Sequence, residues 1–516
     1  MLTPTRCSIA GLMLLAAAHA ARAQPVAIVN VNLIPMDREH VDAAQTVVAR
    51  GDRIVAIGST AGVVVPDGAT IVDGSGRYLL PGLTDAHVHL MGFGPGPREN
   101  FADGPVYLAN GITTVVNLGG PSSPRRSMEL DWKRRVEAGT LTGPTIYTAG
   151  AFVNEPRVTT PDEVERDIRS QARDGYDLIK YHELDDTTTG LSLAAYRKMI
   201  ETAREIGIPL VGHAPNNLGI GVLLQARQPL AHVGNLSNIY FLPMATHTGV
   251  LIVTATAFFV LIGAAALSRP PPLTRWMALS SLLAFLCLSL LLPGGPLYGS
   301  LLLRTIATAL ALLVALAAAV SVSLTVRMWR DARAPALTRM RALVSSVAGV
   351  ALAAVLAIFW TPVAWRSSDR GIDALARRVH DAGIPVLSTL AVYETLSTNR
   401  LYQFPAFNRK VVGALHRAGV TIMAGTDARG IPQVAPGVSL HRELELLVAS
   451  GLTPYEAIRA ATVAPAVFLR KDGEFGTIAA GQRADLLLVA HNPLRDLATL
   501  KAPLGVMARG RWRVLP

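Results

Sequence analysis

Leu79-Leu80-Pro81-Gly82-Leu83-Thr84-Asp85-Ala86-His87-Val88-His89 is the stretch of sequence that decides the fold of this chain. It reads as a strand that ends in two histidines separated by one residue. Side chains on a strand alternate between faces, so His87 and His89 point to the same side and form half of a metal site. Surface strands carry His-x-His by chance, so the pair gains its meaning from the residues that follow it along the chain.

Composition limits the classes of protein to which the chain can belong. It has 516 residues, of which half are hydrophobic and 16% charged, and its net charge is +11. This length suits two or three domains with a large buried core. The basic residues are mostly scattered arginines with no basic tract interleaved with aromatics, which argues against a nucleic-acid partner. Cys7 and Cys287 are the only cysteines. Cys7 would leave with an N-terminal signal and Cys287 lies in an apolar run, so no disulfide framework is predicted.

The N-terminus has the pattern of a secretion signal. Arg6 supplies a positive charge, residues 9–18 are apolar, and Ala21-Arg22-Ala23 is a cleavage motif of small residues before Gln24. The alternative is an uncleaved membrane anchor, but the apolar run is short for a bilayer span. We therefore expect a signal peptide over residues 1–23 and export of the chain that follows it.

Both ends of the mature chain are rich in short strands separated by Gly and Asp turns. Strands are expected at 27–29, 46–49, 53–57, 484–489, 504–507 and 512–514. These segments predict a composite β-sandwich domain assembled from residues 24–78 and 471–516.

Strand and helix signals alternate between these ends. Strands are expected at 113–116, 178–180, 209–211 and 385–392, and helices at 161–173 (capped by Thr160), 193–206 and 372–382. This rhythm indicates a parallel sheet with crossover helices, and we predict a (β/α)8 TIM barrel built from residues 79–247 and 366–470.

The alternation is interrupted over residues 248–365 by four long uncharged stretches, each near or above the length of a membrane span, at 248–268, 276–303, 305–326 and 342–364. We therefore expect an inserted four-helix transmembrane bundle. The loops after the first and third stretches carry arginines, whereas the break between the second and third carries no charge. The positive-inside rule puts the arginine loops in the cytoplasm and both flanks of the insert outside, in agreement with the signal peptide.

Further candidates for a metal site follow predicted strands. Lys180, His213 and Asp427 each close or follow a strand-like run, and His232 follows Leu230-Ala231. In a (β/α)8 barrel such positions converge on the C-terminal mouth. Taken singly, Lys180 would be a surface cation, each histidine a hydrogen-bonded core residue and Asp427 a turn or helix cap. Their shared order favours a metal site.

This ordered set resembles the amidohydrolase superfamily, in particular its imidazolonepropionase-like and prolidase-like metal-dependent branch. The resemblance covers most of the chain except the signal and the insert. The matching stretches are residues 80–89, Gly111-Ile112-Thr113-Thr114-Val115, Asp177-Leu178-Ile179-Lys180, Gly212-His213-Ala214, Ala424-Gly425-Thr426-Asp427-Ala428, residues 451–462 and residues 476–486.

The resemblance implies a role for each candidate. His87 and His89 match the first-strand metal ligands, and Lys180 matches a lysine that is carboxylated by CO2 to bridge two metals. His213 and His232 match the ligands of the second metal, and Asp427 matches the aspartate that binds metal and shuttles protons. Imidazole and carboxylate suit two divalent ions, zinc in particular. Such a pair of ions can hold a hydroxide at neutral pH and polarise a carbonyl.

Two further positions bear on this site. His182 shares the strand face of Lys180 and is a candidate substrate contact, although the family pattern does not require it. Val116-Asn117 stands where relatives often have Arg-Asp, which leaves the support behind the ligands open.

The sequence thus predicts a metal-dependent amidohydrolase that cleaves an amide or other C–N bond of a peptide-like, N-acyl or cyclic amide substrate. It would be anchored in the lipid bilayer with its site on the periplasmic or extracellular side. Because the insert follows His232, the site would face the outer leaflet or a membrane-lined vestibule. The insert could deliver substrate or act as a simple tether. The alternatives are a membrane sensor or transport component with a ligand-binding barrel, and a cyclase of the same superfamily. The oligomeric state stays open.

Overall fold

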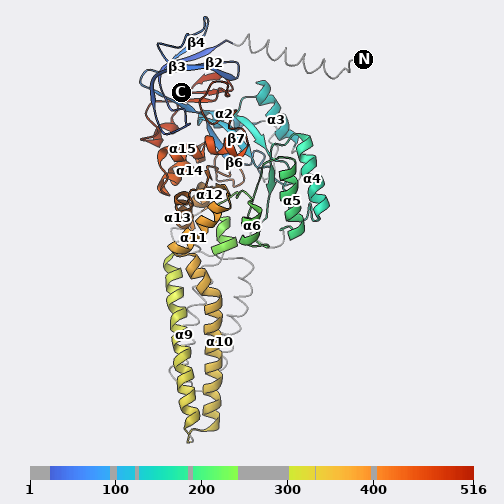
Figure 1. Cartoon of the computed structure of the whole chain (residues 1–516), viewed down its shortest axis with the longest axis vertical. Helices are drawn as coiled ribbons and strands as arrows, with labels where there is room; N and C mark the ends of the chain where they lie inside the picture. Colours follow the sequence, from blue (N-terminus) through green and yellow to red (C-terminus); the bar gives the residue numbers. More distant parts are fainter. Residues whose placement is uncertain are drawn as a thin grey trace.

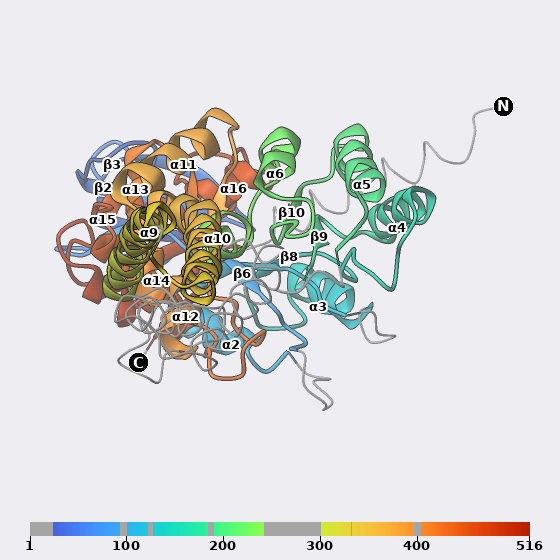
Figure 2. The same ribbon diagram turned by 90° about the horizontal axis from the view of Figure 1, so that it is seen from below.

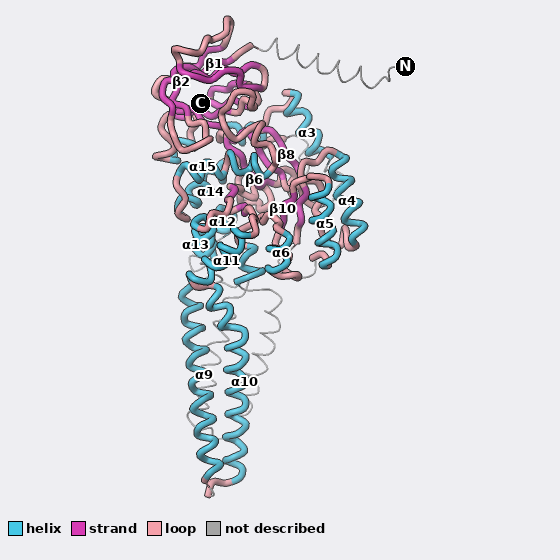
Figure 3. The backbone as a smooth tube through the Cα atoms, in the orientation of Figure 1, coloured by secondary structure: helices cyan, strands magenta, loops and turns pink. Residues whose placement is uncertain are grey.

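The computed structural model describes residues 24–92, 101–121, 127–183, 190–241, 301–331, 333–396 and 404–515. A β-rich end domain lies above an α/β domain, and two long helices project below it (Figures 1 and 3). The predicted signal peptide, the first predicted span and most of the second lie outside the described residues.

The end domain joins the two ends of the chain in one hydrogen-bonded sheet. Its strand order is β15-β14-β13-β5-β1-β2-β3, and β4 pairs with β1. Alternate apolar side chains such as Ile28, Leu79 and Leu486 form its core. The strands are β1 (Val26–Leu33), β2 (Asp42–Arg50), β3 (Arg53–Ser59), β4 (Thr70–Asp73), β5 (Tyr78–Pro81), β13 (Leu486–Val489), β14 (Gly505–Ala508) and β15 (Arg511–Val514).

The α/β domain is a closed ring of parallel strands. β6, β7 and β8 pair in order, β9 pairs with β10, and β11 pairs with β12. Parallel bridges Ala149↔Leu178, Gly212↔Leu230, Leu230↔Val386 and Val88↔Ala428 close the ring. This closure agrees with the predicted barrel. The strands are β6 (Leu83–Val88), β7 (Ile112–Asn117), β8 (Thr145–Thr148), β9 (Ile179–Tyr181), β10 (Leu210–Gly212), β11 (Val386–Leu387) and β12 (Ile422–Met423).

Helices surround the ring; Figure 2 shows α3, α4, α5 and α6 outside β8–β10. α4 begins where the sequence predicts, because Thr160 and Glu163 form a reciprocal capping box. The helices of this domain are α2 (Gly104–Ala109), α3 (Ser127–Ala138), α4 (Pro161–Asp174), α5 (Leu193–Glu205), α6 (Ile220–Ala226), the π-helix η2 (Ser237–Phe241), α11 (Asp369–Asp381), α12 (Leu390–Leu396), α13 (Phe404–Arg417), α14 (Val438–Ala449), α15 (Pro454–Ala460) and α16 (Val463–Phe468); the 3-10 helix η3 (Leu497–Lys501) follows β13.

The predicted strand at 385–392 is wrong in its second half. β11 ends at Leu387, and the chain turns at Thr389, whose φ is +45°, into α12. The buried carboxylate of Glu443 accepts a hydrogen bond from the Ala391 amide at 2.7 Å and another from the Ser388 hydroxyl. This distant acid satisfies the first turn of α12, so an apolar run that reads as a strand becomes a helix.

α9 (Leu301–Arg330) and α10 (Ala336–Arg366) form a helical hairpin that projects from the barrel (Figure 1). Large apolar side chains face outward along it, including Leu312 (67% exposed), Leu316 (63%) and Val347 (61%). Within the described part of the chain, the stretch Thr308–Arg330 is the one helix long and apolar enough to cross a membrane. The predicted four-helix bundle is therefore not confirmed: its third and fourth segments lie in α9 and α10, and the first two fall almost wholly outside the described residues.

Candidate metal centre

Three histidines aim the same ring nitrogen at the barrel mouth because their other nitrogen is held by the main chain. Nδ1 of His87 lies 3.2 Å from the Ala231 carbonyl oxygen, and Nδ1 of His89 lies 2.7 Å from that of Gly119. Nδ1 of His213 lies 2.5 Å from the Glu183 carbonyl oxygen. A carbonyl can only accept, so each Nδ1 carries the proton and each Nε2 is the unprotonated nitrogen of its ring.

Two of these nitrogens converge with a carboxylate. The Nε2 atoms of His87 and His89 lie 3.2 Å apart, and Asp427 Oδ1 lies 3.4 Å from the first and 3.1 Å from the second. His87, His232 and Asp427 offer ligand atoms that all lie within 4.8 Å of one another. Two unprotonated imidazole nitrogens and an anionic oxygen facing each other at these distances suit a cation between them.

His232 and His213 continue the cluster around the mouth. The ring of His232 lies 4.5 Å from that of His87 and 5.0 Å from that of His213, centroid to centroid. Nδ1 of His232 hydrogen-bonds with the Thr389 hydroxyl at 2.9 Å. Burial holds the pKa of His87 and His213 well below the usual range and lowers that of His232 to about 3. The rings are therefore neutral, which is the state that binds metal.

Lys180 lies on β9, fully buried, and its Nζ has no hydrogen-bond partner among the described residues. Burial lowers the pKa of this amine to about 7, against an opposing attraction to Asp427. A buried ammonium without a partner is costly, so the neutral amine is accessible near neutral pH.

Asp427 follows β12 in a left-handed backbone conformation with φ +58°. Its amide donates to the His87 carbonyl at 2.7 Å, which ties this loop to the first barrel strand. Burial tends to raise the pKa of Asp427, but the close approach of His89, together with His232 and Lys180, lowers it overall. A Cβ at Gly430 would lie 2.3 Å from Asp427 Oδ1, and one at Gly425 would lie 2.6 Å from the His87 Cβ. Glycine is therefore required at both positions for the loop to approach the ligands.

Two polar residues behind the ligands have roles that sequence reasoning missed or left open. The buried Asp85 carboxylate accepts from the Thr426 hydroxyl at 2.6 Å and the Thr426 amide at 3.0 Å, joining β6 to the loop that carries Asp427. Asn117 accepts from the Leu90 amide at 2.9 Å and donates to the Thr148 hydroxyl at 2.8 Å. The Asn117 side-chain amide therefore links the segment after His89 to β8 by hydrogen bonds. The period-two alternation of β6 directs Asp85, His87 and His89 to one face. This pattern could have identified Asp85 as a residue that supports the ligands.

His182 lies beside the cluster. Its ring stacks on Phe152 with centroids 4.2 Å apart and an interplanar angle of 4°, and its centroid is 4.3 Å from that of His213. Its Nδ1 is buried and has no hydrogen-bond partner in the described part of the chain. The structure thus brings all six predicted ligands and His182 to one end of the barrel. The ligand atoms of His87, His232 and Asp427 lie within reach of one another, and His89 contacts His87 and Asp427.

Comparisons with known proteins agree with this architecture. Residues 407–513 match the amidohydrolase family. The solved structure of molinate hydrolase shares the fold, with a TM-score of 0.60 and 15% identity over 95% of each chain. Prolidase structures share it too.

The curated relatives match a shorter part of this chain. A dihydroorotase from Anaeromyxobacter sp. (strain K) is 29% identical over 186 residues, which are 34% of this chain and 38% of that protein. An enamidase from Eubacterium barkeri is 37% identical over 132 residues, 24% of this chain and 34% of that protein. The chain therefore matches less than two fifths of the length of these relatives. The matched family and the named relatives agree with the prediction of a hydrolase acting on C–N bonds. The matched family domain, within a fold that the solved amidohydrolases share, supports membership of the amidohydrolase superfamily.

Proposed function

We propose that this chain is a metal-dependent hydrolase that cleaves an amide or related C–N bond of a small peptide-like, N-acyl or cyclic amide substrate. The observation that carries the proposal is the convergence of the Nε2 atoms of His87 and His89 with the Asp427 carboxylate at the C-terminal mouth of a closed barrel. The named relatives, a dihydroorotase and an enamidase, support this class of bond.

The donor set fits two divalent ions, and its nitrogen and oxygen ligands favour zinc. His87, His89 and Asp427 would hold one ion, His213 and His232 the other, and Lys180 would bridge them. The bound ions would supply an activated hydroxide and polarise the scissile carbonyl. His87, His89 and His213 are oriented for this task by their main-chain partners before any ion binds.

Lys180 fits the bridge once it is converted into an anion. Its neutral amine would attack CO2, forming a N–C bond and releasing one proton to give a carbamate. Complete burial and the pKa of about 7 support this step, because a fully protonated amine has no lone pair to react.

Asp427 would handle the proton of the reaction. Its lowered pKa keeps it ionised and able to accept a proton at Oδ1, the atom that faces His89. The same carboxyl group would then donate that proton to the departing nitrogen. His182, whose ring is fixed against Phe152 and whose Nδ1 has no described partner, would donate to or accept from a polar group of the substrate.

We further propose that the hairpin anchors the enzyme in a bilayer. Its outward apolar side chains would contact lipid, and its buried hydroxyls satisfy one another: Ser346 Oγ lies 2.8 Å from Ser321 Oγ and 2.7 Å from Thr325 Oγ1. At about 1.5 Å per residue, the 30 residues of α9 would extend about 45 Å, enough to cross a hydrocarbon core of about 30 Å. The predicted first two spans would complete a four-helix bundle.

The arginines at the tip of the hairpin support an orientation. Arg327, Arg330, Arg333 and Arg339 flank the turn between α9 and α10, at the end remote from the barrel. The positive-inside rule would place this tip in the cytoplasm and the barrel on the periplasmic or extracellular side, as the predicted signal peptide would also do. The hairpin contacts the barrel segment that follows His232, since Arg366 donates to the Tyr240 carbonyl at 3.1 Å.

The test is metal analysis with a turnover screen of dipeptides, N-acyl amino acids and cyclic amides, using full-length protein in detergent. We expect about two bound ions per chain and turnover of at least one substrate class. Asp427→Asn should lower kcat by about 10²- to 10⁴-fold. The matched control, Asp174→Asn at the exposed end of α4, should leave turnover unchanged. Metal-free protein, or full activity of Asp427→Asn, would refute the mechanism and favour a ligand-binding barrel.

A further inference from the structure

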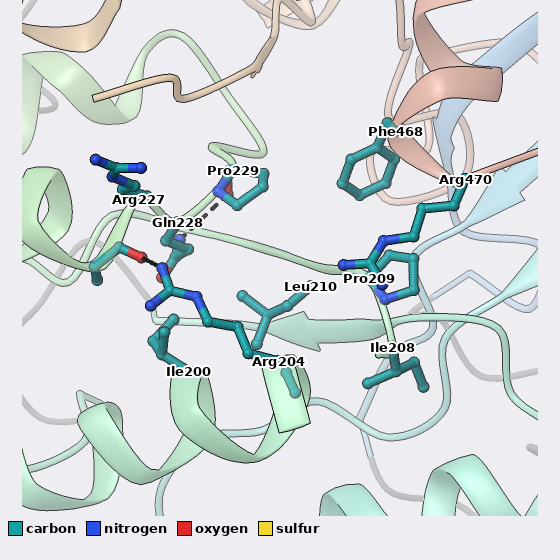
Figure 4. Close-up of a pocket in the computed structure, with 12 residues that line it drawn as sticks. Ile200, Arg204, Ile208, Pro209, Leu210, Arg227, Gln228, Pro229, Phe468 and Arg470 are labelled. Carbon is teal, nitrogen blue, oxygen red and sulfur yellow. Dashed lines mark hydrogen bonds between the residues drawn. The ribbon is translucent and has the colours of Figure 1, made fainter. Parts of the chain in front are cut away.

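A second cavity lies at the opposite end of the barrel from the metal centre. Its volume is about 200 Å³, and Figure 4 shows its lining. Pro209 and Pro229 line it immediately before the strand positions Leu210 and Leu230, whereas the ligand His213 follows β10. The cavity is therefore at the N-terminal ends of the strands, away from the chemistry proposed above.

Three arginines and no acidic residue line this cavity. Arg204 comes from α5, Arg227 follows α6 and Arg470 follows α16. Two of them are held in place by the main chain: Arg204 Nη2 donates to the Ala226 carbonyl at 2.6 Å and Arg470 Nη1 donates to the Gly207 carbonyl at 2.9 Å. Each guanidinium has five N–H donors, so most of them stay available to a ligand.

The carboxylates nearest in sequence to Arg204 have other partners. Glu205 accepts from Arg169 at 2.7 Å, and Glu201 lies 3.1 Å from Lys198. Among the described residues no carboxylate lies within salt-bridge distance of Arg204, Arg227 or Arg470, so their charges are not neutralised within the chain.

Backbone conformation adds a second observation. Arg227 and Arg470 have φ values of +51° and +58°, a region in which residues other than Gly and Asn are disfavoured. Arg227 is the left-handed C-cap of α6, and Arg470 follows the end of α16, so both arginines stand at helix ends that border the cavity.

The rest of the lining is apolar or already satisfied. Ile200, Leu210 and Phe468 supply an apolar wall. Gln228 is fully engaged, since its Oε1 accepts from the Tyr196 hydroxyl and its Nε2 donates to the His213 carbonyl, both at 2.9 Å. The arginines are thus the groups left to recognise a polar ligand.

We propose that this cavity binds a small amphiphilic anion, a carboxylate or phosphate attached to an apolar group. The arginines would bind the anionic head through charge-assisted hydrogen bonds, and the apolar wall would cover the attached group. This site is separate from the metal centre and does not depend on the proposed hydrolase activity.

The test is calorimetric titration of the metal-loaded full-length protein in detergent, with phenyl phosphate as the amphiphilic probe and inorganic phosphate for comparison. We expect saturable binding of phenyl phosphate at one site and weaker binding of inorganic phosphate. Arg204→Gln and Arg470→Asn should each weaken phenyl phosphate binding by at least about ten-fold, or about 1.4 kcal/mol. Asparagine tolerates the left-handed backbone at 470, so misfolding would not explain that loss.

Arg173→Gln, a change at an exposed arginine of α4 outside the cavity, is the matched control and should bind like the wild type. Protein freed of metal by a chelator should also bind unchanged. Absence of saturable binding, undiminished binding by Arg204→Gln and Arg470→Asn, or loss of binding on metal removal would each overturn the proposal.

Discussion

The barrel and the α9–α10 hairpin bury polar groups in opposite ways. The barrel encloses ionisable residues such as Lys180, Asp85 and Glu443 behind a shell of apolar and hydrogen-bonded neighbours. The hairpin buries hydroxyls of Ser321, Thr325 and Ser346 between its helices and turns leucine and valine outward. A domain in water can support buried charge with many partners, whereas a hairpin in lipid, as we propose for α9–α10, would need weak, mutually satisfied groups. The two regions are therefore built for different surroundings.

Metal removal should produce the largest difference in stability between the barrel and the hairpin. A ligand present at about 1,000 times its Kd stabilises the folded state by about 4 kcal/mol, so chelation should lower the barrel's unfolding temperature. The helical signal of the hairpin in liposomes should stay constant. Circular dichroism and tryptophan fluorescence with and without chelator measure both. A barrel transition that does not move on chelation would contradict the proposed metal centre.

Introducing a charge on the hairpin surface should have the next largest effect, which is on membrane insertion. Leu316→Asp places a carboxylate at the middle of α9, where insertion costs about 3 kcal/mol. Leu193→Asp, at an exposed position at the start of α5, should change stability by less than about 0.5 kcal/mol. Flotation with liposomes and carbonate extraction would measure the difference. If both variants partition like the wild type, the hairpin is not in lipid.

Glu443 gives the barrel a pH dependence that the hairpin should lack. Burial raises its pKa from 4.5 to about 7, although hydrogen bonds from Ser388 and the α12 amides oppose this. The folded state then holds the proton between about pH 4.5 and 7 while the unfolded state has lost it. The stabilisation is present in full below pH 4.5 and is lost as pH rises to about 7, by up to about 3 kcal/mol.

Urea unfolding of the barrel between pH 4.5 and 7 tests this expectation. Glu443→Gln, which cannot ionise, should show a flatter dependence than the wild type. Glu394→Gln is the control, because this carboxylate lies at the surface in a bidentate pair with Arg442 and its pKa is lowered. Identical slopes for wild type and Glu443→Gln would show that this residue is not the source.

A matched pair of serine substitutions, one in the barrel and one in the hairpin, should have the smallest effects on stability. Ser388→Ala removes a donor from the buried Glu443 carboxylate and should cost about 1–3 kcal/mol. Ser346→Ala removes the hydroxyl contacts of the hairpin and should cost about 0.6 kcal/mol, the average for such bonds in membrane helices. Thermal unfolding in detergent measures both. A larger loss for Ser346→Ala would reverse the comparison.

Local patterns explain the parts of the molecule that the sequence predicts well. Period-two alternation locates His87 and His89, strand ends locate Lys180 and His213, and Thr160 marks the start of α4. These features depend on neighbours within a few residues.

Features that depend on distant residues were not predictable in this way. α12 replaces half of a predicted strand because Glu443, about 50 residues further on, satisfies its first turn. The arginine-lined cavity joins Arg204 to Arg470, which no local pattern connects. Asp85 gains its role only when β12 is placed beside β6.

The pairing of Leu230 with Val386 determines when the barrel can close during synthesis of the chain. Leu230 pairs with Val386 and accepts a hydrogen bond from the Leu387 amide at 2.9 Å, yet about 155 residues separate the two strands. At about 5–20 residues per second, translation leaves roughly 8–30 s in which the first half of the barrel has no partner for its last strand. An exposed parallel edge is a template for wrong pairing. The first half of the barrel is therefore open to wrong pairing until β11, which follows the hairpin, has been made.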